Sequence, residues 1–227
     1  MKKSGAKKLL FNELKPFFVE NGYKLVTTKF SGFTKEYNND LFWIYFDSKD
    51  YNPCQNIRYY VNKRINIIDK IWMEVDKLYF NIDRVNLETA STLTFTYESL
   101  HGIHERMGYL PDIYTVADVE INAKLIIEFM RDTAFPLLER FNDIREIDKE
   151  INGENFWGDD WRKLFRLSKF PFHRTIIAYL CSNKRIDEIR EDHLKRWTKS
   201  LEEFPDCQNL IDAYLYLFEI LKGIKPL

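Results

Sequence analysis

The chain has 227 residues, of which 34 are basic and 35 acidic, giving a formal net charge of −1. This length can bury a core without disulfides or a structural metal, and 18 Phe, 13 Tyr and 5 Trp supply large side chains for it. The balanced charge argues against the positive field that draws proteins onto nucleic acids or anionic membranes. We therefore expect no specific nucleic-acid partner and no membrane contact.

Cysteine usage and hydropathy indicate the compartment. Cys54, Cys181 and Cys207 form an odd, widely spaced set without a CxxC pair, which is typical of reduced thiols in a cytoplasm. Near the N-terminus, Asn12 and Glu13 interrupt the apolar run too early for a signal peptide. Since no stretch approaches 18 uncharged apolar residues, the sequence predicts a soluble, cytoplasmic protein.

The first predicted element is an amphipathic helix over residues 6–21, because apolar residues recur there at helical spacing and Asn21-Gly22 gives a stop. Pro16 lacks a backbone donor, so we expect the helix to be kinked or split at that residue.

Strand patterns follow the first helix. Residues 41–46 are apolar at both odd and even positions, so both faces of a strand there would be apolar. This predicts a central strand that helices cover on at least one side. Residues 65–77 fit either a helix or a strand. Short strands joined by turns, without a βαβ rhythm, predict an antiparallel sheet. The other expected strands are 23–30, 33–37, 57–62, 78–82 and 93–97.

After Pro111 the pattern becomes helical. A stripe over 116–130 predicts a helix that ends or bends before Pro136, and a second segment continues to Asn152-Gly153. Three more helices are expected near 159–182, 186–203 and 207–222. The fold class is therefore α+β, with an N-terminal antiparallel sheet and a packed helix followed by a C-terminal helical subdomain. We expect a sheet domain at 1–110 and a helical subdomain at 111–227, although the two halves also fit one domain.

The N-terminal part resembles one type of uncharacterised bacterial domain of unknown function. The resemblance lies in the helix with Leu14-Lys15-Pro16, the Gly22-Tyr23 turn and the strands from Phe30 to Phe46, and it covers residues 8–145. It implies a first helix, an antiparallel sheet and a later long helix. It implies no activity, and the residues after 145 lie outside it.

A histidine pair is the nearest approach to a metal motif. His101 and His104 are three residues apart beside Glu105, so both can meet on one helical turn. Further ligands and the zinc-protease order are missing, and Gly102 weakens a helix there. The preferred interpretation is two histidines at the junction between sheet and helices, with no metal and no cofactor.

Residues 155–161 are the most unusual local stretch. Trp157 and Trp161 flank Asp159 and Asp160, a combination that binds a cation or a basic peptide when it is exposed. The alternative is that an aspartate caps the next helix while the indoles fasten the loop to the core. These four residues are candidate binding residues under the first interpretation.

Tyr60 completes the candidate set. Tyr59-Tyr60 beside Arg58, Lys63 and Arg64 is an aromatic and basic cluster, and strand alternation directs one tyrosine inward and the other outward.

Because GxSxG, GxGxxG, GxxxxGK[ST], DFG and HRD are all missing, hydrolase, Rossmann, P-loop and kinase functions lack their starting pattern.

These observations favour a cytoplasmic, non-enzymatic protein that binds a protein partner of unknown identity through sheet edge and helical faces. A regulatory or immunity-like module that masks its partner is one form of this hypothesis. The alternative is an enzyme or small-molecule binder with a site between sheet and helices. The sequence predicts neither the partner nor the oligomeric state.

Overall fold

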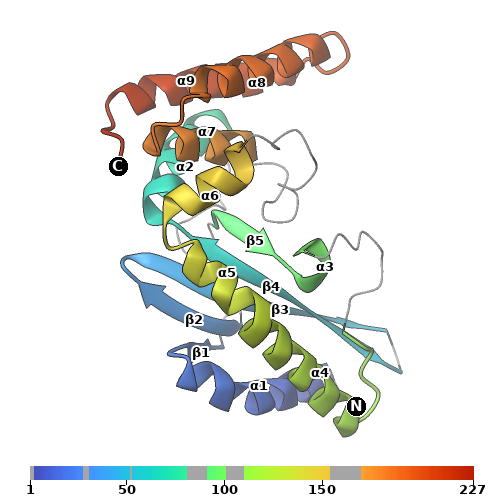
Figure 1. Ribbon diagram of the computed structural model, residues 1–227. Coiled ribbons are helices and arrows are strands. Elements are labelled where there is room, and N and C mark those ends of the chain that lie inside the picture. Colours follow the sequence, from blue (N-terminus) through green and yellow to red (C-terminus); the bar gives the residue numbers. More distant parts are fainter. Residues whose placement is uncertain (1–2, 28–30, 52, 81–90, 101–109, 154–169) are drawn as a thin grey trace. The chain divides into compact units, whose positions relative to one another are not determined.

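The computed structural model describes residues 3–27, 31–51, 53–80, 91–100, 110–153 and 170–227 (Figure 1). It confirms the α+β class, with an antiparallel sheet and a helical C-terminal half. The chain divides into two compact units. Unit 1 contains residues 1–63 and 93–140, and unit 2 contains residues 64–92 and 141–227. Among the described residues, no helix has the length and apolar character needed to cross a bilayer.

A five-stranded sheet forms the centre of unit 1. Its strands follow one another in space in the order of the sequence, and β3 is the middle strand, as the apolar run at 41–46 predicts. Asn38 and Asn39 have positive φ angles of 49° and 69°, which allow the tight turn between β2 and β3. The strands are β1 (Lys24–Val26), β2 (Gly32–Tyr37), β3 (Asp40–Asp50), β4 (Gln55–Arg64) and β5 (Leu93–Phe95).

Helices α1 (Lys3–Glu20) and α4 (Val116–Phe129) pack on one face of this sheet. The ring of Phe11 in α1 lies 5.3 Å from Phe46 of β3, and Phe129 of α4 lies 5.7 Å from Tyr59 of β4. Figure 1 shows α4 running across the strands. This face forms the buried core of unit 1, which the alternation of apolar residues along β3 and β4 explains.

The helix is not split at Pro16, because α1 is one helix with Pro16 inside it. Pro16 is exposed, whereas Leu10, Leu14 and Phe18 are buried, so packing of the opposite helix face outweighs one missing backbone hydrogen bond. The helix predicted to end or bend before Pro136 ends as α4 at Phe129, where a π-helical segment, η1 (Met130–Ala134), leads into α5 (Phe135–Arg140). A short helix, α3 (Tyr97–Leu100), follows β5.

Unit 2 consists of helices within the described residues. The ambiguous segment 65–77 is helical, and Leu78 and Tyr79 end that helix instead of starting the strand expected at 78–82. Rings of α2 and α7 meet where Trp72 lies 4.6 Å from Phe172, and Phe172 also contacts Tyr214 of α9. The helices are α2 (Asn66–Tyr79), α6 (Ile144–Asn152), α7 (Phe170–Leu180), α8 (Ile186–Ser200) and α9 (Cys207–Lys222).

The two units are discontinuous in sequence, whereas the sequence predicts a division at residue 110. The difference has two causes. Helix α2 buries its apolar stripe against α7 and α9, and α4 packs on α1, so each of these helices groups with partners on the far side of residue 110.

Candidate functional site

The predicted site residues are only partly within the described structure. Trp157, Asp159, Asp160 and Trp161 lie outside the described residues, as do His101 and His104. Tyr60 is described and lies in β4. Within the described ranges, no three His, Cys, Asp or Glu side chains are grouped so that they could hold a metal ion.

Tyr60 belongs to a row of aromatic rings on the sheet face opposite α1 and α4. Tyr59 is only 3% exposed and points into the core, while Tyr60 is half-buried on the other face, as alternation predicts. The Tyr60 ring stacks on Tyr45 of β3 at 6.0 Å, and Trp43 lies 5.7 Å from Tyr45. We call Trp43, Tyr45, Tyr60 and Arg58 the aromatic face.

The side chains of Asn62 and Thr94 link the strands next to these rings. Asn62 Nδ2 donates to the Trp43 carbonyl at 3.1 Å and Thr94 Oγ1 donates to Asn62 Oδ1 at 2.9 Å. These bonds join β3, β4 and β5 beside the rings. The aromatic face therefore combines rigid rings with strands that hydrogen bonds link to one another. Such a surface can bind a partner with little loss of conformational entropy.

Arg58 lies two residues before Tyr60, on the same face of β4. Within the described part of the chain, its guanidinium makes no hydrogen bond or ion pair. Of the basic residues expected around Tyr60, Lys63 points into the core and is fully buried, whereas Arg58 and Arg64 share the sheet face of Tyr60 by strand alternation. The Lys63 ammonium lies 4.8 Å from the Phe42 ring centroid, and burial lowers the pKa of Lys63 to about 8.

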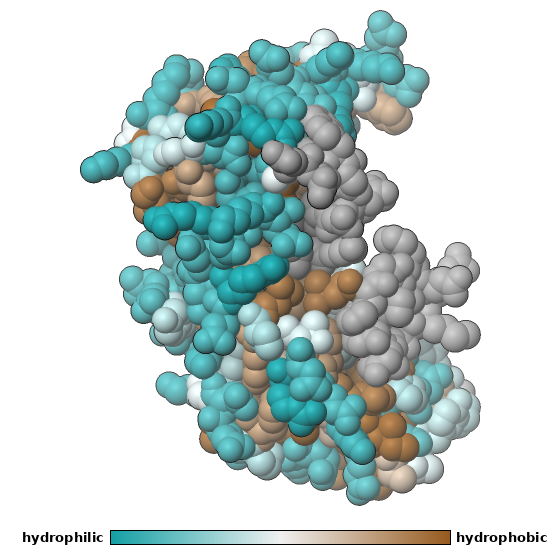
Figure 2. Space-filling model, viewed as in Figure 1, coloured by the Kyte–Doolittle hydropathy of each residue, from teal (hydrophilic) through white to brown (hydrophobic). Residues whose placement is uncertain are grey.

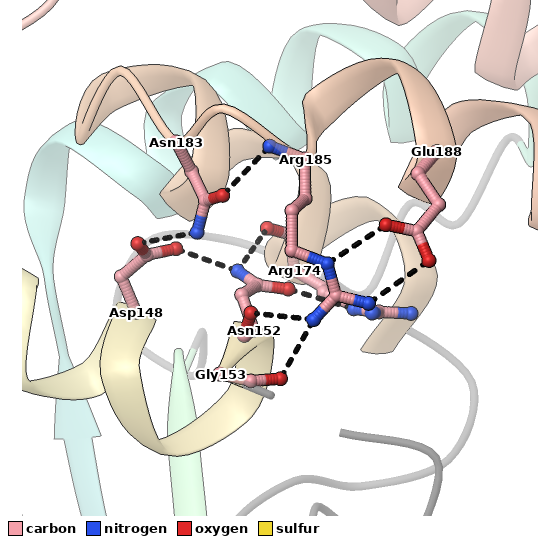
Figure 3. Close-up of polar contacts among 7 residues, drawn as sticks. All are labelled: Asp148, Asn152, Gly153, Arg174, Asn183, Arg185 and Glu188. Carbon is pink, nitrogen blue, oxygen red and sulfur yellow. Dashed lines mark hydrogen bonds and ion pairs between the residues drawn. The ribbon is translucent and has the colours of Figure 1, made fainter. Parts of the chain in front are cut away.

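Unit 2 contains a buried polar network that sequence reasoning missed (Figure 3). Asp148 of α6 accepts hydrogen bonds from Asn152 Nδ2 and from Asn183 Nδ2, both at 2.7 Å. Burial raises the pKa of Asp148, and the two amides partly offset that effect. The carboxylate therefore joins α6 to the loop between α7 and α8.

Arg174 of α7 is the largest charged group in this network. It is only 1% exposed, and its Nε donates to Asn152 Oδ1 at 2.8 Å. Burial lowers the pKa of Arg174 to about 9, which is unusual for a guanidinium. An arginine in a mostly apolar helix, Phe170–Leu180, is a sequence signal that indicates a buried charge here.

Arg185 connects the end of α6 to the start of α8. Its Nη1 donates to the carbonyls of Asn152 and Gly153, at 3.3 and 2.7 Å, which are among the acceptors that a helix end leaves unbonded. Its Nε and Nη2 also form a two-point contact with Glu188, at 2.8 and 3.0 Å (Figure 3). This geometry is that of a structural link between two helices.

A third group in unit 2 combines residue types used in catalysis. Thr92 Oγ1 donates to Asp69 Oδ2 at 2.6 Å and accepts from the Ile65 N–H at 2.8 Å, while His173 Nε2 lies 3.5 Å from Asp69 Oδ1. A nucleophile relay needs the imidazole between hydroxyl and carboxylate. In the described contacts the carboxylate lies between the hydroxyl and the imidazole, and Thr92, Asp69 and His173 are all buried.

His193 of α8 lies among aromatic rings. It stacks on Trp197 with 5.6 Å between ring centroids and meets the edge of Tyr214 at 5.6 Å. Burial lowers the pKa of His193 to about 3, and the nearby Arg174 and Arg196 lower it further. The imidazole is therefore neutral and part of the core at neutral pH.

The helical surface offers a different character from the aromatic face. Hydrophilic side chains dominate the visible surface of α8 (Figure 2), where Lys195, Arg196 and Lys199 are exposed. Such a surface is typical of a solvated helix face.

Comparison of the chain with protein-family models, with curated proteins and with solved structures finds no match. The resemblance of residues 8–145 to an uncharacterised bacterial domain therefore stays a prediction.

Proposed function

We propose that this protein is a non-enzymatic, cytoplasmic interaction module of a regulatory or immunity-like kind, which binds a protein partner through the aromatic face. The observation that carries the proposal is the row of Trp43, Tyr45 and Tyr60, three half-buried rings in mutual contact on the sheet face opposite the core helices. Tyrosine, tryptophan and arginine are the residues that dominate binding energy at protein interfaces.

The contacts around the rings support the same proposal. Each ring is restrained by a neighbouring ring or strand, so little side-chain entropy is lost when a partner covers it. The polar groups of unit 2 support the proposal indirectly. Asp148, Asn152 and Arg185 bond to one another or to backbone carbonyls, which is a structural role, and the Asp69 group has the wrong order for a nucleophile relay.

The experiment is affinity capture from the native lysate with the full-length protein immobilised and the captured proteins quantified by mass spectrometry. Wild-type protein should capture a protein in stoichiometric amount. Tyr60→Ala should reduce that amount by about tenfold or more, since a central tyrosine contributes roughly 2 kcal/mol at an interface. Tyr114→Ala is the matched control, because Tyr114 is an exposed tyrosine of unit 1 that is not one of the aromatic-face residues.

Circular dichroism and thermal unfolding of each variant separate lost binding from lost folding. If folded Tyr60→Ala and folded Tyr45→Ala both capture as much as wild type, the aromatic face is not the interface and the proposal fails.

A further inference from the structure

Arg58 distinguishes the aromatic face from a purely apolar one. Its backbone lies two residues from Tyr60 in β4, so the guanidinium is on the same side of the sheet as the stacked Tyr45 and Tyr60 rings. Its Nε is buried, and no described residue offers that nitrogen an acceptor. Covering the guanidinium without an anionic partner would leave a desolvated charge, which is costly.

The carboxylates near Arg58 have other hydrogen-bond partners, as Asp112 does, which accepts from Asn56 Nδ2 at 3.1 Å. Asp47 lies two residues beyond Tyr45, yet it forms no ion pair with Arg58. The Asp47 carboxylate accepts from the Ser48 N–H at 2.9 Å, and its charge acts on Lys7 of α1. Glu36 also lies on this side of the sheet. Thr34 pairs with Trp43, and Glu36 is two residues further along β2, so both have the same orientation; Glu36 is exposed.

We infer that the partner presents a carboxylate to Arg58, flanked by an apolar side chain that contacts Tyr60 and Tyr45. This inference rests on the proposed function and specifies the chemistry of the partner. A carboxylate matches the planar guanidinium through two parallel hydrogen bonds, and charge-assisted bonds of this kind are stronger than neutral ones. The rings exclude water around the pair and so strengthen it.

A nucleic-acid phosphate is the other anion that an arginine recognises. Proteins that bind single strands combine stacking rings with a groove of several basic residues along the backbone. Here strand alternation places the acidic Glu36 and Asp47 and the basic Lys49 and Arg64 on the same side of the sheet as Arg58, and the net charge of the chain is −1. A face that mixes both signs of charge in this way fits a single carboxylate better than a repeating phosphate backbone.

The test uses the same immobilised full-length protein, with the captured lysate proteins as the probe and three changes at one position. Arg58→Met keeps the stem and removes the charge, and should reduce capture by about tenfold or more. Arg58→Glu should reduce capture further, because it places like charges together, whereas Arg58→Lys should retain part of it. Arg145→Met is the matched control, since Arg145 is an exposed arginine on α6.

The effects of the Tyr60 and Arg58 variants on capture separate this inference from the proposed function, and nuclease treatment tests for a nucleic-acid partner. Suppose that Tyr60→Ala abolishes capture while a folded Arg58→Met or Arg58→Glu variant captures as wild type does. The inference of a partner carboxylate is then wrong, and the proposed interface at the aromatic face is retained. If capture is independent of both Tyr60 and Arg58, the proposed function fails and the inference fails with it. If nuclease treatment of the lysate removes the captured material, the partner is a nucleic acid and the inference is overturned.

Discussion

Acidification should destabilise unit 2 through one residue, His193. The pKa of this imidazole is about 3 in the folded protein and 6.5 in the unfolded chain. Between these two values the unfolded chain binds a proton that the folded protein does not, so stability rises with pH in this window and is lost as the pH falls below 6.5. The contribution is fully lost only below about pH 3.

The magnitude follows from the difference between the two pKa values. At pH 5 the pH is about 1.5 units below the pKa of the imidazole in the unfolded chain. Each such unit lowers the free energy of unfolding by about 1.4 kcal/mol. Lowering the pH from 7 to 5 should therefore reduce the free energy of unfolding by about 2 kcal/mol through His193 alone. The rings of Trp197 and Tyr214 occupy the space that a hydrating shell would need.

The assay is urea denaturation followed by circular dichroism at pH 7 and pH 5, for wild type and for His193→Phe. The variant keeps an aromatic ring and cannot titrate, so its loss between the two pH values should be about 2 kcal/mol smaller than that of wild type. Other titrating groups, such as Asp148, are common to both proteins and cancel in the comparison. Equal losses in the two proteins, or an NMR titration of His193 near pH 6.5, would refute the reasoning.

Three further changes test individual contacts by urea denaturation at pH 7. Gln55→Leu should raise the free energy of unfolding by about 1–2 kcal/mol, because Gln55 is 2% exposed and its amide has no partner among the described residues; a lower stability would show that the amide is satisfied. Gly32→Ala should cost about 2 kcal/mol or more, since an added Cβ would lie 1.9 Å from a carbonyl oxygen of β3, whereas the control Gly223→Ala meets its nearest atom at 3.5 Å. Arg185→Lys should cost about 1–2 kcal/mol, because separate guanidinium nitrogens contact the carbonyls and Glu188 and lysine has a single nitrogen; an unchanged midpoint would contradict the helix link.

Local pattern predicted most elements because periodicity records which face of an element is buried. The run at 41–46 is apolar at both parities and forms the middle strand, and Tyr59 and Tyr60 divide between the two faces as alternation requires. Leu78 and Tyr79 were mispredicted because aromatic and apolar residues also suit strands. Their helical conformation depends on packing of α2 against α7 and α9, which local propensity does not contain.

The candidate sites show the same limit. Tyr60 was identified from two adjacent tyrosines, but its neighbour Tyr45 lies 15 positions away and is reached only through the pairing of β3 and β4. Asn152 and Arg174 are separated by 22 positions, and Asp148 and Asn183 by 35, so no local spacing announces their contacts. The Trp157 to Trp161 stretch lies outside the described residues, and its binding role stays a prediction.

The discontinuity of the two units has a consequence for synthesis on the ribosome. Helix α2 presents Trp72, whose ring is covered by Phe172 of α7, and α7 is made about 100 residues later. At roughly 5–20 residues per second, this apolar surface waits about 5–20 s for its partner during translation. For that interval the apolar stripe of α2, which is an amphipathic helix, lacks the ring that covers Trp72 in the folded protein.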